Sequence, residues 1–315
     1  MDERTKSAVD WLLASKEPAI RRLVMTDVLG EKVRTGDDEV LGGPIVRALL
    51  AGQQEDGGFG GHPYKKWTGA HWRLVSLAEL GIPKREERAV RALETVLAWL
   101  TGKSHRDAVR EVAGRTRRCA SQEGNALAVA SRLGVADDPR VQLLASSLVA
   151  WQWPDGGWNC DARPRVTTSS VHESVSPAWG LWEYAKATGD ADAERAARRA
   201  AESFLERRIF RSRRTGEVMH RDVVKLHWPP YWHYDFLRAL VVLRRMGLLG
   251  DPRAADALDL LEQRRLVDGR WRAGAYWWSK PGSARAAEVV DWGRDGQNEM
   301  ITLHALTVLR TAGRL

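Results

Sequence analysis

The chain has 315 residues, of which 43% are hydrophobic and 29% charged, so it can bury a sizeable core and is not expected to be disordered. Its 49 basic and 41 acidic residues give a net charge of +8, but the arginines are spread along the chain among acids, which favours an ordinary solvated surface over a nucleic-acid interface. No apolar run is long enough for a transmembrane segment and the N-terminus lacks a signal-peptide pattern, so we expect a cytoplasmic protein, with peripheral membrane contact left open.

Glycines and prolines divide the chain into pairs of helices. Predicted helices end in an apolar residue or Thr followed by a glycine that suits the position just after a helix, at Gly81, Gly134, Gly189 and Gly247. Asp-Pro-Arg, at 138–140 and 251–253, suits a capped first turn. In chain order, the predicted pairs are 4–14 with 18–29, 41–53 with 66–80, 84–101 with 117–133, 138–152 with 172–187, 190–208 with 228–246, and 251–265 with 296–312.

The two helices of a pair differ in composition. Second helices, such as FLRALVVLRRM and ITLHALTVLR, are apolar on nearly every side, whereas first helices, such as AERAARRAAESFLERR, have an apolar stripe and a charged face. We therefore expect residues 1–315 to form one all-α domain, an α/α toroid of about six inner and six outer helices built from two-helix repeats of about 50–60 residues. An open solenoid of helical hairpins is the alternative, although its inner layer would be less uniformly apolar.

The loops after three predicted outer helices share a motif: a Gln, an Asp-Gly pair and an aromatic residue two positions after a glycine. Its copies are Gln54…Gly57-x-Phe59, Gln152…Gly156-x-Trp158 and Gln263…Gly269-x-Trp271. The motif resembles the QW motif of squalene and oxidosqualene cyclases, and over nearly its whole length the chain resembles the superfamily of terpenoid cyclases and protein prenyltransferases. The resemblance implies an α/α toroid in which the Gln caps a neighbouring helix, the glycines turn the chain and the aromatic ring packs between hairpins.

The sequence departs from the catalytic members of that superfamily. Class II cyclases protonate their substrate with the middle Asp of an Asp-x-Asp-Asp motif, which does not occur here, and they generally use two barrels where this chain has one. Protein prenyltransferases bind zinc through Asp, Cys and His. Here zinc would require Cys160, Asp161, His172 and His233 to converge. Their spacing in the sequence is wider than that of usual zinc ligands, so no cofactor is predicted. Cys119 is expected to be a small apolar residue.

Polar and aromatic residues concentrate at the predicted starts of the inner helices, which should share one mouth of the barrel. Residues 227–235 alone hold four aromatic residues, two histidines and an acid. Desolvation among aromatic rings favours a neutral acid, so Asp235, Glu173 and Glu299 are the candidate catalytic acids, with helix capping as the alternative role. The candidate substrate-binding residues of the expected pocket are Trp67, His71, Trp72, Trp179, Trp228, Tyr231, Trp232, His233 and Asn298.

Three functions are compatible with this pattern. The first is an enzyme that binds, and cyclises or otherwise transforms, an isoprenoid or other apolar substrate by acid chemistry, with aromatic faces stabilising cationic charge. The second is a non-catalytic binding or scaffold toroid that acts beside a protein partner or as a homodimer. The third is a carbohydrate-processing α6/α6 barrel with tryptophan platforms. Retention of prenyl ligands in native mass spectrometry would favour the first function.

Overall fold

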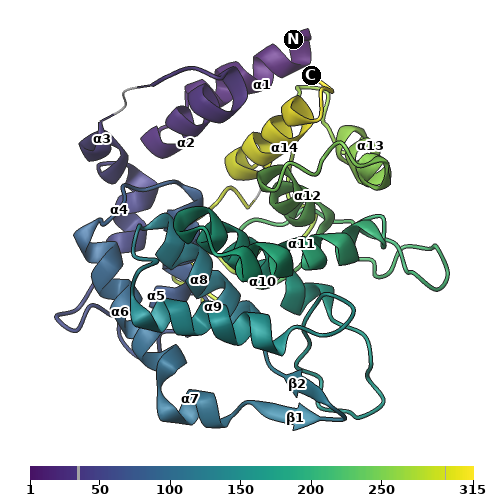
Figure 1. The fold of residues 1–315 in the computed structure, drawn as a ribbon. Coiled ribbons are helices and arrows are strands. Elements are labelled where there is room, and N and C mark those ends of the chain that lie inside the picture. The colour runs from purple at the N-terminus through teal and green to yellow at the C-terminus, as the bar shows by residue number, and fades with distance from the viewer. Residues whose placement is uncertain (34–35, 295) are drawn as a thin grey trace.

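The computed structural model describes residues 1–33, 36–294 and 296–315. Its helices alternate along the chain between two layers (Figure 1). The outer layer holds α1 (Glu3–Leu13), α3 (Asp37–Leu41), α4 (Pro44–Leu50), α6 (Glu87–Thr101), α9 (Pro139–Trp151), α11 (Ala191–Leu205), the short 3₁₀ helix η2 (Pro252–Ala254) and α13 (Ala255–Gln263). The inner layer holds α2 (Pro18–Leu23), the π-helix η1 (Val24–Leu29), α5 (Ala70–Glu79), α8 (Ser121–Arg132), α10 (Val171–Thr188), α12 (Phe236–Arg245) and α14 (Glu299–Thr311). In the described chain, the six predicted helix pairs are confirmed and the protein is all-α.

The inner helices form a closed ring. Along the ring α5 packs against α8, α8 against α10, α10 against α12 and α12 against α14, and α14 in turn packs against α2 and η1 at the beginning of the chain. Arg22 of α2 then donates to the carbonyl of Gly81, just after α5. The outer helix α1 also contacts α14, and the two termini lie close together (Figure 1). Inner helices α5, α8 and α12 are buried along almost their whole length, as their composition predicts. The chain therefore forms an α/α toroid rather than an open solenoid.

Several inner helices begin later than predicted: α5 begins at Ala70 and not at 66, and α14 at Glu299 and not at 296. The helix expected from residue 228 begins at Phe236, because Pro229 and Pro230 lack the backbone N–H that a helix interior requires and Asp235 caps the helix that follows. The helix expected from residue 117 begins at Ser121. Before it the chain forms the short helix α7 (Lys103–Asp107) and an antiparallel hairpin of β1 (Arg110–Val112) and β2 (Arg115–Arg117).

The three motif loops share one geometry, but only one of the predicted Gln residues has the predicted role. The Gln152 side chain donates to the carbonyls of Gly156 (2.7 Å) and, in the next outer helix, Ala196 (2.8 Å). In the first copy the equivalent residue is Gln53, which donates to Gly57 and Arg88. Gln54, predicted for this role, instead makes the backbone turn bonds of its loop.

In the third copy an arginine replaces the glutamine. The Arg265 guanidinium, four residues before Gly269, donates to the Gly269 carbonyl (3.2 Å), as Gln152 does to Gly156. Gln263, predicted for this role, lies on the exposed part of α13. The prediction was wrong because the position four residues before the glycine, and not the residue type, defines the contact.

Close backbone packing explains the glycines of the motif. Gly57, Gly156 and Gly269 have φ values of +86°, +88° and +81°, and a Cβ atom at each would lie 2.4, 2.4 and 2.0 Å from a backbone carbonyl oxygen of the next outer helix. For Gly269 that oxygen belongs to Arg4 of α1. The contact that joins neighbouring hairpins elsewhere thus also joins the last hairpin to the first.

The predicted aromatic residues of the motif are packed as expected. Trp158 and Trp271 are 1% and 0% exposed, and their indole N–H groups donate to the carbonyls ten residues earlier, in the preceding outer helix. The phenyl ring of Phe59 has no N–H group to donate in this way. Arg73 lies over its ring at 4.0 Å and donates to the carbonyl of Leu49, which is the equivalent acceptor.

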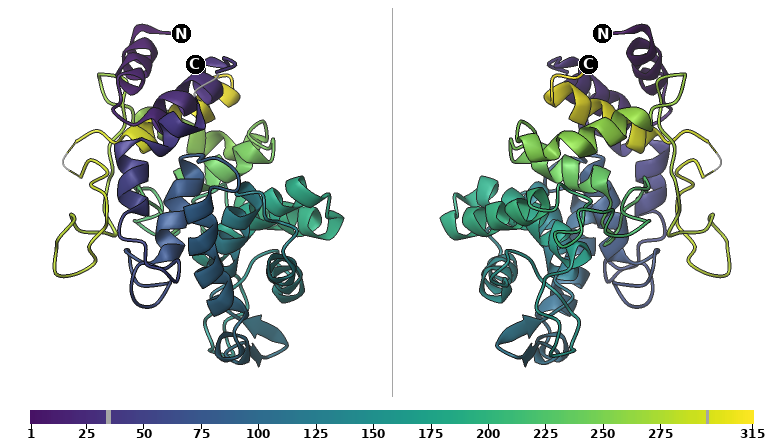
Figure 2. Two further views of the ribbon diagram at one scale, coloured as in Figure 1. Left: turned by 90° about the vertical axis from the view of Figure 1, so that its left-hand side faces the viewer. Right: turned by 90° about the vertical axis from the view of Figure 1, so that its right-hand side faces the viewer.

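Residues 264–294, between α13 and α14, run as a long extended segment along one side of the molecule (Figure 2). We call this segment the strap. It lies across the N-terminal ends of inner helices, where the Trp67 indole N–H donates to the carbonyl of Trp277 (2.7 Å) and the Trp278 indole N–H to that of Trp228 (2.8 Å). Among the described residues, no helix combines the length and apolar character that crossing a bilayer requires.

Candidate functional site

Several residues predicted to line a pocket do lie together at the N-terminal end of the inner ring. The rings of Trp67 and Tyr231 are stacked with centroids 3.7 Å apart, and Trp72 contacts both rings edge-on. His71 packs edge-on against Trp72. The density of aromatic residues in the sequence therefore identified a real cluster, which we call the aromatic end.

The strap fills the aromatic end. The Trp277 ring stacks on His233 with centroids 3.8 Å apart, and His233 in turn stacks on Trp232 at 3.9 Å. Trp67 and Tyr231 are only 4% and 1% exposed. The rings thus pack against one another, and their faces are not open to a ligand as the predicted concave pocket would require.

Other predicted site residues lie apart from this cluster. The Trp179 indole lies farther along α10, under the guanidinium groups of Arg238 (4.4 Å) and Arg245 (5.2 Å). Trp228 packs against His304 on the neighbouring α14. Asn298 caps α14 and bonds the carbonyl of Trp292, so its amide is engaged in the fold.

Asp235 is held at the start of α12 by hydrogen bonds within the protein. One oxygen accepts from the backbone N–H of Arg238 (2.8 Å), and the other lies 3.0 Å from the backbone nitrogen and 3.1 Å from the ring Nδ1 of His227. The residue is 2% exposed. This geometry is that of a helix cap with a buried histidine partner.

Glu173 is a buried acid and Glu299 a half-buried one, and they lie in different places. Burial raises the pKa of Glu173, although its carboxylate accepts from the backbone N–H of Ser121 (3.0 Å). Burial also raises the pKa of Glu299, which bonds the Ser15 side chain near the first helix pair. The three candidate acids thus have three separate sets of partners.

Glu288 of the strap is a further buried acid, one that the sequence pattern did not predict. It accepts a hydrogen bond from the Tyr231 hydroxyl, and burial raises its pKa to about 7. Nothing in the surrounding sequence indicates this, because the strap has no helical or strand periodicity that would place Glu288 against the inner ring.

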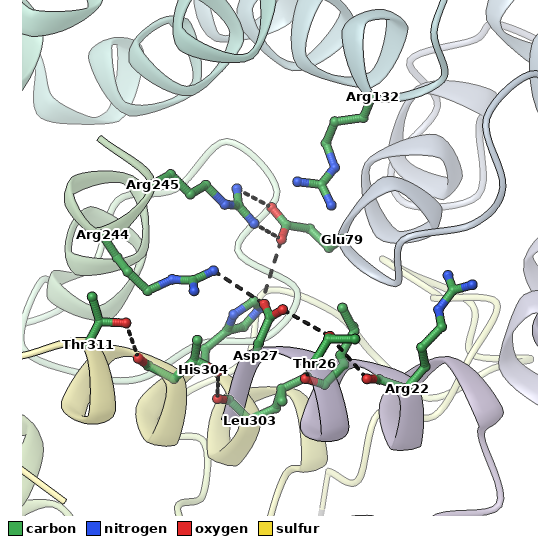
Figure 3. A network of polar contacts seen from close by, with 12 residues as sticks. Arg22, Thr26, Asp27, Glu79, Arg132, Arg244, Arg245, Leu303, His304 and Thr311 are labelled. Atoms are coloured by element: carbon green, nitrogen blue, oxygen red, sulfur yellow. Dashed lines mark hydrogen bonds and ion pairs between the residues drawn. The ribbon is translucent and has the colours of Figure 1, made fainter. Parts of the chain in front are cut away.

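The structure also has a polar cavity at the C-terminal ends of the inner helices, of about 420 Å³, which we call the central cavity. In the described part of the chain, every inner helix contributes to its wall, and Figure 3 shows some of the side chains that converge there, among them Glu79, Arg132 and Arg245. Its lining residues are Leu23, Asp27, Glu79, Arg132, Glu183, Lys186, Arg244, Arg245, Leu303, His304 and Thr307.

A buried carboxylate anchors the central cavity. Glu79 of α5 accepts from Arg238 (2.6 Å) and, through both oxygens, from Arg245 (3.2 and 2.5 Å). Although burial favours protonation, Arg245 and Arg238 hold the pKa of Glu79 well below its usual range. His304 lies 3.9 Å from the same carboxylate, and burial lowers the pKa of its imidazole to about 3, so the ring is neutral at pH 7.

The other cations of the central cavity are less tightly held. The Arg244 guanidinium lies 3.4 Å from Asp27, and the Arg132 guanidinium lies 3.4 Å from Glu183. Lys186 is exposed at the rim. The lining therefore has four cations against three carboxylates, and one of those carboxylates, Glu79, is also shared with Arg238 behind the wall. Such a site attracts anions.

The zinc ligands considered from the sequence are not arranged as a metal site. The Asp161 carboxylate pairs with Arg163, and His172 accepts from the backbone N–H of Tyr234 (2.9 Å). The Cys160 thiol lies instead beside Cys119 and Glu173. Cys119 is thus not the isolated small apolar residue that was expected.

The sequence matches no protein-family model, and no curated protein matches it significantly. Among solved structures, the chain is similar to the apo form of MstE, a type II terpene cyclase from Scytonema. The two chains are 14% identical, the alignment covers 86% of this chain and 96% of that one, and the TM-score is 0.30. The all-α ring described above rests on its own helices and contacts, and the site has to be interpreted from its chemistry.

Proposed function

We propose that this protein binds a small anionic ligand, a phosphate, diphosphate or carboxylate, in the central cavity. The observation that carries the proposal is the convergence of Arg132, Lys186, Arg244 and Arg245 from three different inner helices on one cavity. Guanidinium groups are well suited to this task, because their planar array of donors matches phosphate and carboxylate oxygens.

The weak internal ion pairs favour an exchange of partners. Arg244 and Arg132 meet their carboxylates at 3.4 Å, longer than the 2.5 and 2.6 Å contacts that Arg245 and Arg238 make with Glu79. A ligand anion can replace the long contacts while the Glu79 network stays in place. The rigid network would then orient the two outer guanidinium groups toward the ligand.

The cavity volume and its apolar wall bear on the ligand class. About 420 Å³ lies within the range of small-molecule sites, and Leu23 and Leu303 add apolar surface beside the charges. Of the substrates that the sequence resemblance implies, an isoprenyl diphosphate has both a polyanionic head and an apolar tail. Under this proposal the diphosphate occupies the central cavity.

Titration calorimetry with inorganic diphosphate, farnesyl diphosphate and farnesol tests the proposal. Both diphosphates should bind, more weakly as salt rises, and farnesol should not. Because a charge-assisted hydrogen bond contributes about 1.5–3 kcal/mol, Arg244→Ala should weaken binding by roughly tenfold or more, and Arg132→Ala should do the same. The matched control is Arg195→Ala, which removes an exposed arginine of α11.

Unchanged diphosphate affinity in an Arg132→Ala/Arg244→Ala double variant would contradict the proposal. So would tight binding of farnesol, because an uncharged ligand gains nothing from the guanidinium groups. Thermal melts of each variant should accompany the titrations, so that lost binding is not confused with lost folding.

We further propose that an isoprenoid whose diphosphate occupies the central cavity is protonated from the opposite end of the inner ring, by one of the acids at or near the N-terminal ends of the inner helices. The raised pKa values of Glu173, Glu299 and Glu288 support a neutral, donating form, and Asp235 is retained from the sequence prediction. Product analysis for Glu173→Gln, Glu299→Gln, Glu288→Gln and Asp235→Asn would identify the donor as the variant that binds ligand but loses turnover. Unchanged turnover in all four variants would exclude these acids.

A further inference from the structure

Two cysteines are fixed side by side at the N-terminal ends of α8 and α10, at the opposite end of the inner helices from the central cavity. The backbone N–H of Arg118 donates to the carbonyl of Asn159 (3.1 Å). The residues that follow these two are Cys119 and Cys160. The bond therefore brings together two loops that are 41 residues apart in the chain.

Glu173 completes the group. Its Oε2 atom accepts from the backbone N–H of Ser121 at 3.0 Å, which orients the carboxylate, and its Oε1 atom lies 3.7 Å from the Cys160 sulfur. The two sulfurs and a carboxylate oxygen all lie within 4.8 Å of one another. For a tetrahedral zinc ion with Zn–S of about 2.3 Å and Zn–O of about 2.0–2.2 Å, neighbouring sulfur and oxygen ligands are separated by roughly 3.6 Å.

We propose that Cys119, Cys160 and Glu173 bind a Zn²⁺ ion. On binding, each thiol releases its proton to solvent and its sulfur lone pair forms a Zn–S bond, and the Glu173 carboxylate forms the third bond. Two thiolates and a carboxylate suit zinc better than magnesium or calcium, which take oxygen ligands only.

Three protein ligands leave a fourth tetrahedral position open. Structural zinc sites are usually closed by four protein ligands, whereas catalytic sites keep one position for water or substrate. Cys160 is exposed and Cys119 half-buried, so the group is reached from solvent, while Glu173 is buried behind it. The inferred site is thus of the open type, with its fourth ligand a water molecule or a donor atom of a substrate.

The two cysteines also influence each other's ionisation, as expected for neighbouring thiols. The hydrogen bond with Cys160 lowers the pKa of Cys119, and the same bond raises the pKa of Cys160. A divalent cation bound by all three groups offsets the mutual repulsion of the two thiolates and the Glu173 carboxylate.

The test uses the full chain, reduced and stripped of metal with a chelator. Because Cys119 and Cys160 are the two cysteines of the sequence, every thiolate signal comes from this group. Zinc titration against a chromophoric chelator should give one ion per chain. Cobalt should give a sulfur-to-metal charge-transfer band with tetrahedral ligand-field absorption, and zinc should protect both thiols from a thiol reagent.

Substitution of each proposed zinc ligand should lower the affinity for zinc. Cys119→Ser and Cys160→Ser should weaken zinc binding by more than the roughly 10–100-fold that removal of a second-shell group costs, and each should abolish part of the cobalt charge-transfer band. Glu173→Gln should weaken binding while retaining the band. The control is Asp161→Asn, which removes the partly exposed acid next to Cys160, one that pairs with Arg163, and should leave the affinity unchanged.

Cys160→Ser changes an exposed residue, so it should fold even if a buried variant does not, and circular dichroism melts check this. The proposal is overturned if the reduced, folded chain takes up no zinc, or if Cys160→Ser binds zinc as tightly as the unmodified chain. It is also overturned if the two cysteines form a disulfide that persists in reducing buffer.

Discussion

The Arg265 guanidinium donates a 2.7 Å hydrogen bond to the Thr5 hydroxyl, a residue 260 positions earlier in the chain. The same guanidinium lies 3.4 Å from the Asp2 carboxylate and donates to the carbonyl of Gly269. Gln53 and Gln152 reach backbone carbonyls of α6 and α11 from equivalent positions, so Arg265 makes the corresponding contact across the junction of the last and first hairpins. Closure of the ring thus reuses the contact that joins its other hairpins.

Arg265→Ala should lower the free energy of unfolding by roughly 1–3 kcal/mol, because it removes hydrogen bonds of a charged donor and leaves the Gly269 carbonyl without this partner. Arg265→Gln should recover part of the loss, since glutamine bonds the equivalent glycine in the other two loops. Urea unfolding measures both. Arg264→Ala, at the exposed neighbouring position, should change the free energy of unfolding little. A loss of stability equal to that of Arg265→Ala would contradict a specific role for Arg265.

Gly156→Ala should be far more destabilising than Gly189→Ala. Both glycines have positive φ, +88° and +79°, so both substitutions incur the backbone strain of an L-residue in that region. A Cβ at Gly156 would also lie 2.4 Å from the carbonyl oxygen of Arg199, whereas nothing lies within 4 Å of one at Gly189.

Overpacking of this kind costs about 1–3 kcal/mol beyond the strain, which the difference between the two melting curves should reveal. Equal destabilisation of the two variants would mean that the loop moves away from α11 without cost. The hairpin contact would then not contribute to closure of the ring.

The helix pairs could be predicted because their signals are local. A glycine such as Gly189 after a helix, or an Asp such as Asp138 before Pro139, acts within a few residues and is visible in the sequence. Arg265 could not be recognised in the same way. Its role exists only because α1 lies beside α13 in the ring, and its neighbour Gln263 matched the expected residue type.

The candidate site was only partly predictable, for a similar reason. The aromatic end appears in the sequence as the dense run at 227–235, but the side chains that fill it, such as Trp277, come from a strap without periodicity. The cations of the central cavity give no signal at all. Arg132 and Arg245 each lie in the last turn of a separate helix, where a basic residue is ordinary because it complements the helix dipole.

Trp158→Ala should lower the free energy of unfolding by roughly 3–5 kcal/mol, because it empties a fully buried site. Trp158→Phe should cost less, since Phe59 fills the equivalent site of another hairpin, but it leaves the Leu148 carbonyl without its indole donor. Chemical denaturation measures both. A small stability change for the alanine variant together with loss of ligand binding would reverse the structural assignment.

Glu79→Gln should lower stability by roughly 3–5 kcal/mol at pH 7, because it leaves the buried guanidinium of Arg238 without its charge partner. The pKa of Glu79 lies well below its usual range, so this contribution is present at neutral pH and is lost only as the pH falls below about 4. The unmodified chain and the variant should therefore converge in strong acid. A constant difference down to that pH would show that packing, and not charge, is responsible.

The effect of Glu288→Gln on the free energy of unfolding should depend on pH. Burial raises the pKa of Glu288 from 4.5 to about 7, so below pH 4.5 both the folded and the unfolded chain hold the proton and the fold is not penalised. Between 4.5 and 7 the folded chain retains a proton that the unfolded chain has lost, so the free energy of unfolding falls as the pH rises, by roughly 3 kcal/mol at most. Glutamine stays neutral and can still accept a hydrogen bond from the Tyr231 hydroxyl. The free energy of unfolding of the variant should therefore rise relative to that of the unmodified chain between pH 5 and pH 8. Glu55→Gln, in an exposed loop, provides the baseline, and parallel curves for all three chains would mean that Glu288 ionises without cost through a rearrangement of the strap.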